Sequence, residues 1–479
     1  MSARELVHAF KWSLASEIAA KAIQPVVFIV LARLLMPEDF GVMSAALMVI
    51  GFSQIFWEAG MSKALIQRQT AIEDAANVAF WINIGLGVVV ALLLFVAAGP
   101  IAQTIFHDPR VTAVLQVMTL QVFLGAVSSV HTALLQKDMG FKKLFWVRFA
   151  TVSLPGLASI PLAWNGMGYW ALVAGTLVGQ TTQVVMLWHM SRWRPRMTFR
   201  LDLAQEMGRF GAWVGASGLL AWLYVWADAL VVGMYLGSHE LGLYQTGNQF
   251  AGMIFALVFG PIVPVLYSHC ARMNGDQARL RHIMERAIKT IIVIAIPIAF
   301  VVFSLSEPAG LLLFGEQWLG IGLVIGVMAL MHGYSWIVGM NGEAYRAMGK
   351  PALETIVTGS TLAIYLVAYL ISIGHGLETF VWTRLTLAIG ALLLHLTVLR
   401  KVLSLPLTPL LKFMLITSLL SWLITMAVSH IFNSYDHSAW QSVIFCGLID
   451  LAMIFSALYL MERKGAVAEL AALFRRGRM

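Results

Sequence analysis

Residues 12–69 contain two long apolar runs separated by a short polar turn. The runs cover about residues 12–35 and 40–60, and Met36-Pro37-Glu38-Asp39 lies between them. Each run has about 20 residues or more, which is enough for a helix to cross a hydrocarbon core of about 30 Å. The pattern predicts two membrane-spanning helices joined by a tight turn, and any fold of this chain has to accommodate that pair.

Similar apolar runs recur along the whole chain. Hydrophobic residues make up 59% of the sequence and charged residues only 12%, whereas a soluble domain has about 25% charged residues. The sequence therefore predicts an all-α membrane protein with about 14 transmembrane helices. We place the spans at about residues 12–35, 40–60, 77–99, 110–135, 145–165, 168–190, 208–236, 245–270, 287–313, 318–340, 352–373, 377–400, 410–432 and 438–461.

The connections between these spans alternate in charge. One set is rich in Lys and Arg, as in Arg192–Arg200, whereas the other set, which includes Met36–Asp39 and Asn433–Ser438, contains neither residue. Basic connections are retained in the cytoplasm, so both termini are expected to be cytoplasmic. The net charge of +8 is explained by this topology, and we expect no nucleic-acid partner.

A faint internal repeat suggests how the helices are grouped. Leu35–Val42 can be aligned with Leu236–Leu243, and both are short polar turns followed by the next span. Two copies in the same orientation predict two six-helix lobes related by an axis along the membrane normal. The predicted domains are an N-terminal six-helix lobe (1–200), a C-terminal six-helix lobe (201–402), two extra transmembrane helices (403–462) and a basic cytoplasmic tail (463–479).

Charged residues inside the predicted spans are the first candidates for a site, because such charges are costly in a membrane and usually face the bundle interior. Glu17 and Lys21 lie on one helix face, so mutual neutralisation is the structural alternative for this pair. Near the membrane interface, Arg209 can snorkel to the headgroups. The full set is Glu17, Lys21, Arg33, Arg148, Arg209, Asp228, Arg384, His395 and Asp450.

Cations outnumber anions in this set, which suits an anionic substrate such as a pyrophosphate group. A transporter that exports cationic drugs is expected to favour carboxylates in its cavity instead. We predict a cationic substrate site, with Glu17 and Asp228 shaping its field or coupling an ion. The four cations assigned to it are Lys21, Arg33, Arg148 and Arg384.

Several other kinds of site are not expected. Cys270 and Cys446 lie far apart without metal-ligand spacing, so neither a disulfide framework nor a metal site is predicted. The sequence lacks the Walker A, HExxH and GxSxG patterns, and its connections on the non-cytoplasmic side are short. We therefore expect a transporter without a cofactor rather than an enzyme. The alternatives are a drug or metabolite antiporter and a structural or enzymatic component of a larger membrane assembly.

Several of these segments resemble a known family. They are similar to bacterial polysaccharide-repeat-unit exporters, the lipid-linked oligosaccharide flippases of the multidrug/oligosaccharidyl-lipid/polysaccharide superfamily. The resemblance covers about residues 20 to 350. The segments that carry it are Leu31–Leu35, Pro37–Gly41, Glu58–Gly60, Ala64–Arg68, Asp228, Val232-Gly233, Leu236-Gly237, Leu241–Tyr244 and Leu313–Trp318.

The resemblance implies a protein of the bacterial cytoplasmic (inner) membrane that works by alternating access. Its substrate would be an undecaprenyl-pyrophosphate-linked oligosaccharide, flipped for exopolysaccharide or lipopolysaccharide biosynthesis. Membrane lipids, a polysaccharide polymerase and assembly proteins are the candidate partners. In related lipid flippases the last two helices form a groove for the lipid tail, a role that residues 403–462 would take here.

Overall fold

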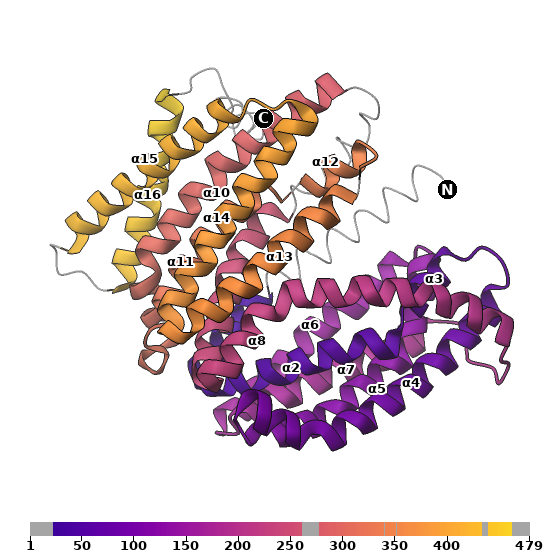
Figure 1. Cartoon of the computed structure of the whole chain (residues 1–479). Coiled ribbons are helices and arrows are strands. Elements are labelled where there is room, and N and C mark those ends of the chain that lie inside the picture. The colour runs from indigo at the N-terminus through magenta and orange to yellow at the C-terminus, as the bar shows by residue number, and fades with distance from the viewer. Residues whose placement is uncertain (1–22, 261–276, 340, 351, 434–438, 462–479) are drawn as a thin grey trace. The chain divides into compact units, whose positions relative to one another are not determined.

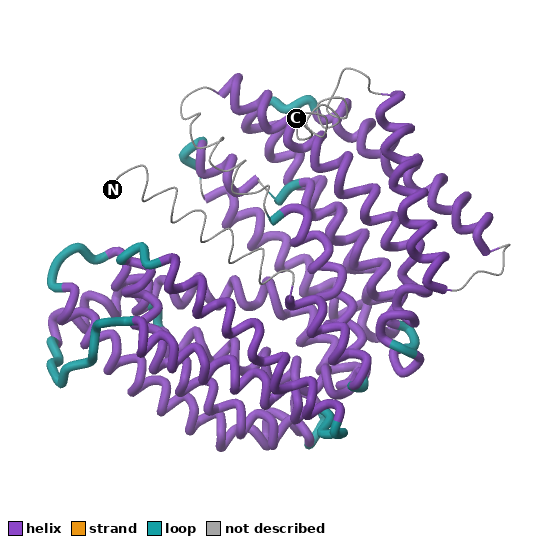
Figure 2. Tube along the Cα trace, turned by 180° about the vertical axis from the view of Figure 1, so that it is seen from behind, coloured by secondary structure: helices purple, strands orange, loops and turns teal. Residues whose placement is uncertain are grey.

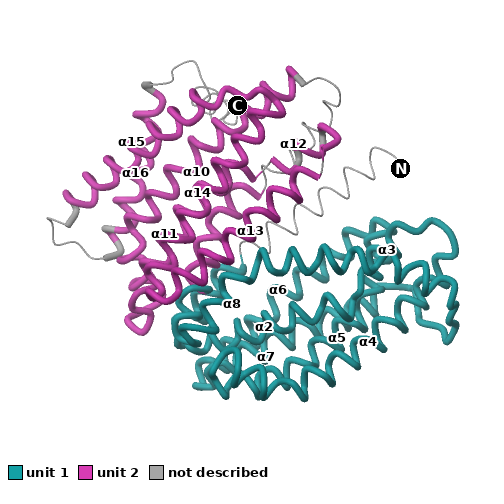
Figure 3. Tube along the Cα trace, in the orientation of Figure 1, with its two compact units in different colours: residues 1–245 teal, residues 246–479 magenta. Residues whose placement is uncertain are grey.

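The computed structural model describes residues 23–260, 277–339, 341–350, 352–433 and 439–461. Nearly all of these residues lie in helices, and no strand occurs among them (Figures 1 and 2). The prediction of an all-α fold is confirmed for this part of the chain. The chain forms two compact units, residues 1–245 and 246–479 (Figure 3).

The first unit begins with a helix described from Ile23 to Leu34. The last helix that starts in this unit, α8, continues past the unit boundary and bends at Gly237, whose φ of 83° suits a residue without a Cβ. The other bounds are α2 (Pro37–Glu58), α3 (Met61–Gln67), α4 (Ile72–Ile101), the π-helical turn η1 (Ala102–Phe106), α5 (Arg110–Lys137), α6 (Phe141–Trp164), α7 (Tyr169–Met190) and α8 (Leu201–Phe259).

The second unit is also a bundle of helices. Short 3-10 turns, η2 (Glu316–Trp318) and η3 (Ile373–His375), join neighbouring helices. The helices are α10 (Gln277–Phe314), α11 (Ile321–Ile337), α12 (Asn341–Ala347), α13 (Ala352–Ser372), α14 (Gly376–Leu403), α15 (Leu407–Asn433) and α16 (Ala439–Met461).

Nine helices in the described ranges are long and apolar enough to cross a membrane. Two of them, Leu201–Phe259 with 59 residues and Ala352–Leu403 with 52 residues, are each long enough for two crossings, since one crossing needs about 20 residues. Every predicted span coincides with a helix at least in part. The number of crossings, the cytoplasmic position of the termini and the division at residues 200 and 402 stay predictions.

The packing is that of a bundle in lipid. Large apolar side chains such as Leu92, Leu93 and Val96 of α4 are exposed on the outer surface, and Val96 is 78% exposed. Small residues lie between the helices instead: a Cβ placed on Gly179 of α7 would be 2.9 Å from Pro155 Cγ of α6. Small residues at helix interfaces allow the close approach that stabilises membrane bundles.

One end of the first unit collects basic residues. Lys143 Nζ donates to the carbonyl of Met190 at 2.8 Å, and Lys137 Nζ donates to the carbonyls of Ile66, at 3.1 Å, and of Arg68. These bonds satisfy carbonyls that the helix ends leave without partners. We call this the basic end, comprising Ile66–Arg68, Lys137–Lys143 and Met190–Arg200.

The opposite end of the same unit collects acidic residues. Asp39 accepts hydrogen bonds from the backbone N–H groups of Met36, at 3.0 Å, and Tyr169, at 2.9 Å. Its carboxylate thereby joins the first turn of α2 to the first turn of α7. We call this the acidic end, comprising Glu38, Asp39, Asp108, Ser238 and His239. The predicted alternation of connection charge corresponds to these two ends in the first unit.

Candidate functional site

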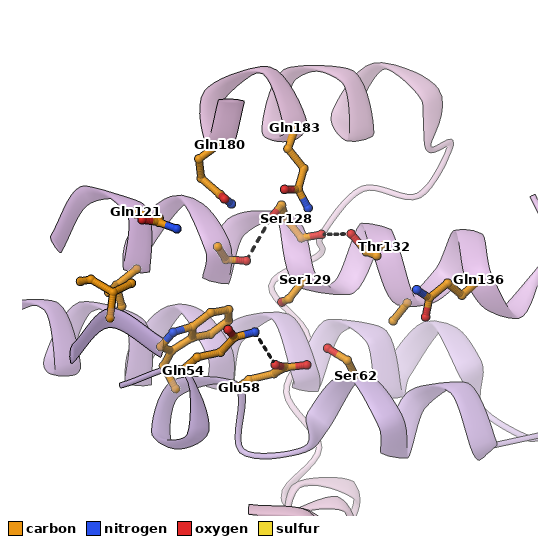
Figure 4. A pocket seen from close by; sticks show the side chains of 15 residues that line it. Gln54, Glu58, Ser62, Gln121, Ser128, Ser129, Thr132, Gln136, Gln180 and Gln183 are labelled. Carbon is orange, nitrogen blue, oxygen red and sulfur yellow. Dashed lines mark hydrogen bonds between the residues drawn. The ribbon is translucent and has the colours of Figure 1, made fainter. Parts of the chain in front are cut away.

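The first unit contains a polar cavity of about 290 Å³ between α2, α3, α5 and α7. Glutamine, serine and threonine side chains dominate its wall (Figure 4). We call it the amide cavity. It is lined by Ile50, Gln54, Trp57, Glu58, Ser62, Gln121, Val122, Gly125, Ser128, Ser129, Thr132, Ala133, Gln136, Gln180 and Gln183.

Helix α5 supplies the largest part of this wall. Its lining residues recur at helical spacing, so they form one polar stripe along the helix. Ser128 Oγ donates to Gly125 O at 3.1 Å, and Thr132 Oγ1 donates to Ser128 O at 3.2 Å. Because these protons point into the backbone of α5, the hydroxyl oxygens present acceptor lone pairs to the cavity.

Glycine at position 125 is required by the neighbouring wall. A Cβ on Gly125 would be 3.0 Å from Trp57 Cζ2, which is tighter than an ordinary contact. The absence of a side chain leaves room for the ring edge of Trp57 of α2, which is buried, to approach α5 closely. The cavity therefore has one aromatic surface beside its amides.

Amide side chains enter the cavity from α7. Gln180 and Gln183 share a face of that helix and point from α7 toward α5 (Figure 4). Each amide offers two donors and one acceptor. Across the cavity, Gln121 and Gln136 of α5 offer the same groups.

A single carboxylate lies at the margin of the amide cavity. Glu58 is the last residue of α2, and Gln54 Nε2 donates to its Oε2 at 3.0 Å. Glu58 is half-buried. The cavity is thus largely neutral, with one negative group near the basic end.

Two atoms of the cavity wall lack hydrogen-bond partners among the described residues. They are the buried atoms Ser62 Oγ and Gln121 Oε1. Buried polar groups without partners cost about 1–3 kcal/mol each, so such atoms are normally satisfied by a ligand or by water. A ligand with many hydroxyl groups, such as a sugar, matches this wall because each hydroxyl both donates and accepts.

The charged residues predicted from sequence are distributed differently. Glu17 and Lys21 lie outside the described residues. Arg33 is exposed near the end of the first helix. Arg148 is exposed on α6 and lines a second pocket, which shares residues with the amide cavity. Arg148 is therefore the one predicted cation that the described structure brings next to this site.

Two other predicted residues have side-chain partners elsewhere. Arg384 of α14 bonds the hydroxyl of Tyr369, and its guanidinium lies 5.6 Å from the centre of that ring. Asp228 of α8 is 4% exposed and accepts a 2.6 Å hydrogen bond from Tyr244 Oη. Asp228 is thus paired with Tyr244, and its proposed coupling role stays a prediction.

Uncharged polar residues were missed when the sequence was searched for charges. The signal was present, because Gln121, Ser128, Thr132 and Gln136 follow helical spacing within or at the edge of one apolar run, and Gln180 and Gln183 do so in another. Two histidines behave as residues of the helix bundle. His131 is fully buried beside Trp188, with ring centres 4.8 Å apart, and His332 bonds Asn248 at 3.1 Å.

The family model described as "Polysaccharide biosynthesis protein" matches residues 30–322, more than half of the chain. The chain belongs to this family. The resemblance to polysaccharide exporters predicted from sequence is confirmed. Among its relatives, the succinoglycan biosynthesis transport protein ExoT of Rhizobium meliloti is 29% identical over 333 residues, which cover 70% of this chain and 67% of ExoT.

Solved structures show the same fold. The lipid II flippase MurJ, in an inward closed conformation, matches with a TM-score of 0.74 and 13% identity, covering 96% of this chain and 100% of MurJ. An inward-facing multidrug resistance MATE family transporter of the MOP superfamily matches with a TM-score of 0.60 and 15% identity, covering 82% of this chain and 96% of the other. The protein is thus a multi-pass bacterial inner-membrane protein with a transporter fold.

Proposed function

We propose that this protein flips an undecaprenyl-pyrophosphate-linked oligosaccharide from the cytoplasmic to the periplasmic leaflet by alternating access, for surface polysaccharide biosynthesis. The observation that carries the proposal is the amide cavity, in a chain of a polysaccharide biosynthesis family. Its amides, hydroxyls and Trp57 suit a sugar, and its buried Ser62 Oγ and Gln121 Oε1 need polar partners. ExoT, a transport protein for succinoglycan biosynthesis, and MurJ, a lipid II flippase, support the same class of cargo.

The charge distribution of the first unit supports the direction of transport. By the positive-inside rule, the basic end faces the cytoplasm. The amide cavity extends toward that end, because Glu58 ends α2, Ser62 lies in α3 and Gln136 precedes Lys137. Sugars assembled in the cytoplasm would therefore meet the cavity first from the side where they are made.

Cationic residues in the spans would recognise the pyrophosphate of the same substrate. Arg148, which lies beside the amide cavity, attracts the pyrophosphate. Lys21, Arg33 and Arg384 stay predicted cations of the substrate site, and Glu17 and Asp228 shape the local field or couple an ion. If charge-removing substitutions at all four cations leave export unchanged at normal protein levels, this assignment is wrong.

The test uses a strain that lacks the gene. We expect lipid-linked repeat units to accumulate on the cytoplasmic face and surface polysaccharide to disappear. Complementation with Gln180→Ala together with Gln121→Ala should restore export to less than about a tenth of the wild-type level, because each lost hydrogen bond contributes about 1 kcal/mol or more. A matched control is Gln69→Ala, an exposed glutamine in the connection after α3, which should complement fully.

An antiporter for drugs or metabolites is the second candidate. Glu58 in the cavity and the fold shared with a multidrug transporter favour it. Normal polysaccharide in the deletion strain, with drug sensitivity that only a Glu58-containing protein relieves, would support the antiporter and overturn the flippase.

A further inference from the structure

A second pocket, of about 580 Å³, lies between α5, α6 and α7 at the basic end of the first unit. We call it the Arg148 groove. Phe141, Leu144, Phe145 and Leu187 line one part of it, whereas Arg148 and Thr151 bring polar groups. The groove is therefore amphipathic, unlike the amide cavity.

The two pockets are adjacent. Thr132, Gln136 and Gln183 line both of them. A ligand in the Arg148 groove would therefore lie next to the amide cavity, at these three shared side chains. The groove wall is apolar and cationic, whereas the cavity wall is largely neutral and hydrogen-bonding.

The packing of α6 explains the groove. Helix α6 contacts α7 along its length but has few contacts with α5. Val147 and Leu187 are buried together with Leu135, and Leu144 packs against them. This cluster closes the floor, while the separation of α6 from α5 leaves the space above it.

Arg148 lies in the part of α6 nearest the basic end. It follows Phe141, the first residue of α6, by about 10 Å at a rise of 1.5 Å per residue. A long arginine side chain at that depth reaches headgroup level. Its planar guanidinium binds phosphate oxygens through paired hydrogen bonds, which a lysine cannot do.

We propose that the Arg148 groove binds the pyrophosphate and the first isoprene units of the lipid carrier while the attached sugars occupy the amide cavity. The lipid would therefore enter from the inner leaflet beside α6. This inference rests on the proposed function, since it assigns the phosphate and lipid parts of the same substrate. A membrane phospholipid has a phosphate and apolar chains too, and it is the competing source of this chemistry.

The test measures farnesyl diphosphate binding to the full-length protein in phosphatidylcholine nanodiscs, by titration calorimetry. We expect Arg148→Gln to weaken binding by about tenfold or more, because hydrogen bonds to charged groups are the strong ones. Arg148→Lys should fall between Arg148→Gln and the wild type. Lys142→Gln is the matched control, as it removes an exposed cation from the same helix outside the groove, and it should bind normally.

Further ligands and variants separate the parts of the proposal. Farnesol should bind Arg148→Gln and the wild type equally, and Phe145→Ala should weaken farnesol binding. Phosphatidylglycerol added to the nanodiscs should not displace farnesyl diphosphate; displacement at equal mole fraction would identify a phospholipid site and overturn the proposal. An equal effect of Arg148→Gln and Lys142→Gln, or no effect of either, would also overturn it.

Gln180→Ala with Gln121→Ala distinguishes this inference from the proposed function. Both residues line only the amide cavity, so farnesyl diphosphate binding should be unchanged while export falls. If instead the deletion strain exports polysaccharide normally but farnesyl diphosphate binding still requires Arg148, the proposed binding groove is supported and the proposed glycan-flipping function is wrong.

Discussion

Glu38 and His239 occupy equivalent positions in the two copies of the sequence repeat, and their side chains are in contact. His239 Nδ1 lies 2.9 Å from Glu38 Oε1. The backbones around them meet in the same reciprocal way: a Cβ on Gly41 would be 1.8 Å from Ser238 O, and a Cβ on its equivalent Gly242 would be 1.8 Å from Pro37 O. Residues that contact their own equivalents lie on a local two-fold axis.

The Glu38–His239 pair should contribute little to stability. Their side chains are 33% and 45% exposed, and exposed ion pairs contribute about 0.2–1 kcal/mol. A double-mutant cycle with Glu38→Gln and His239→Ala, followed by denaturant unfolding in detergent, should give a coupling energy in that range. A coupling energy above about 2 kcal/mol would show that the pair is shielded from solvent.

The close approach of the two backbones should contribute more to stability than the Glu38–His239 pair does. Gly41→Ala places a methyl group against a backbone carbonyl that cannot rotate away, so we expect a loss of about 1–3 kcal/mol or more. Gly242→Ala should cost a similar amount because its contact is equivalent. The control is Gly85→Ala in α4, which has open space around the new Cβ and should be neutral or stabilising by up to about 1 kcal/mol. Equal effects at positions 41 and 85 would contradict the reciprocal packing.

The sequence predicted this region in part. The alignment pairs Leu35–Val42 with Leu236–Leu243, two segments that contact each other in the structure, while the topology inferred from the alternating charges stays a prediction. Their mutual contact could not be predicted, because it depends on how the second half of α8 folds back after Gly237. A left-handed φ at one glycine decides that direction, and sequence alone does not specify it.

The candidate site was harder to predict than the fold. Charges inside the spans indicate candidate sites because they are costly in lipid, yet the cavity is built mainly from Gln121, Ser128, Gln180 and other uncharged groups. Which face of a membrane helix turns inward is decided by packing. Helix α5 carries its uncharged polar stripe within an otherwise apolar run, and the sequence does not specify that this stripe lines a cavity. Arg148 is predicted as a site residue because a cation in a span is rare, and its role stays a prediction.

Tyr244→Phe tests whether Asp228 has a structural role. The change removes the 2.6 Å hydrogen bond to a carboxylate that is 4% exposed. A lost hydrogen bond to a buried charged group costs about 1.5–3 kcal/mol, which unfolding in detergent can measure. Export per folded molecule should remain normal. A loss of export without a loss of stability would instead indicate that Asp228 acts in coupling.

Asp108 should make the acidic end sensitive to low pH. Burial raises the pKa of Asp108, but hydrogen bonds from Arg110 and from Ser238 outweigh burial and hold the pKa below its ordinary value of 3.8. The Ser238 Oγ–Asp108 Oδ2 distance is 2.6 Å. Because the pKa is lower in the folded state, the stabilisation is complete above that ordinary value and is lost as the pH falls through the folded-state pKa.

Asp108→Asn should therefore lower the melting temperature at pH 7, and the difference from the wild type should shrink below pH 3.8. Melting curves across this range measure the effect. Ser238→Ala should cause a smaller loss with the same pH dependence. A difference that stays constant with pH would show that the carboxylate charge is not involved.

Asp450 of α16 should lower the stability of the second unit. It is 1% exposed, and its Oδ1 has no hydrogen-bond partner among the described residues. Asp450 is one helical turn before Ile454, which is buried in a cluster with Val293 of α10 and packs near Leu420 of α15. Asp450 therefore faces the same apolar interface.

An unsatisfied buried polar group costs about 1–3 kcal/mol, so Asp450→Leu should raise the free energy of unfolding by that amount, whereas Asp450→Asn should change it little. Ser456→Leu, at an exposed position of the same helix, controls for the added apolar surface and should be close to neutral. Denaturant unfolding in detergent distinguishes the three variants. If Asp450→Leu instead lowers the free energy of unfolding, the carboxyl group has a partner that stabilises it. Asp450 would then help to hold α16 against the bundle.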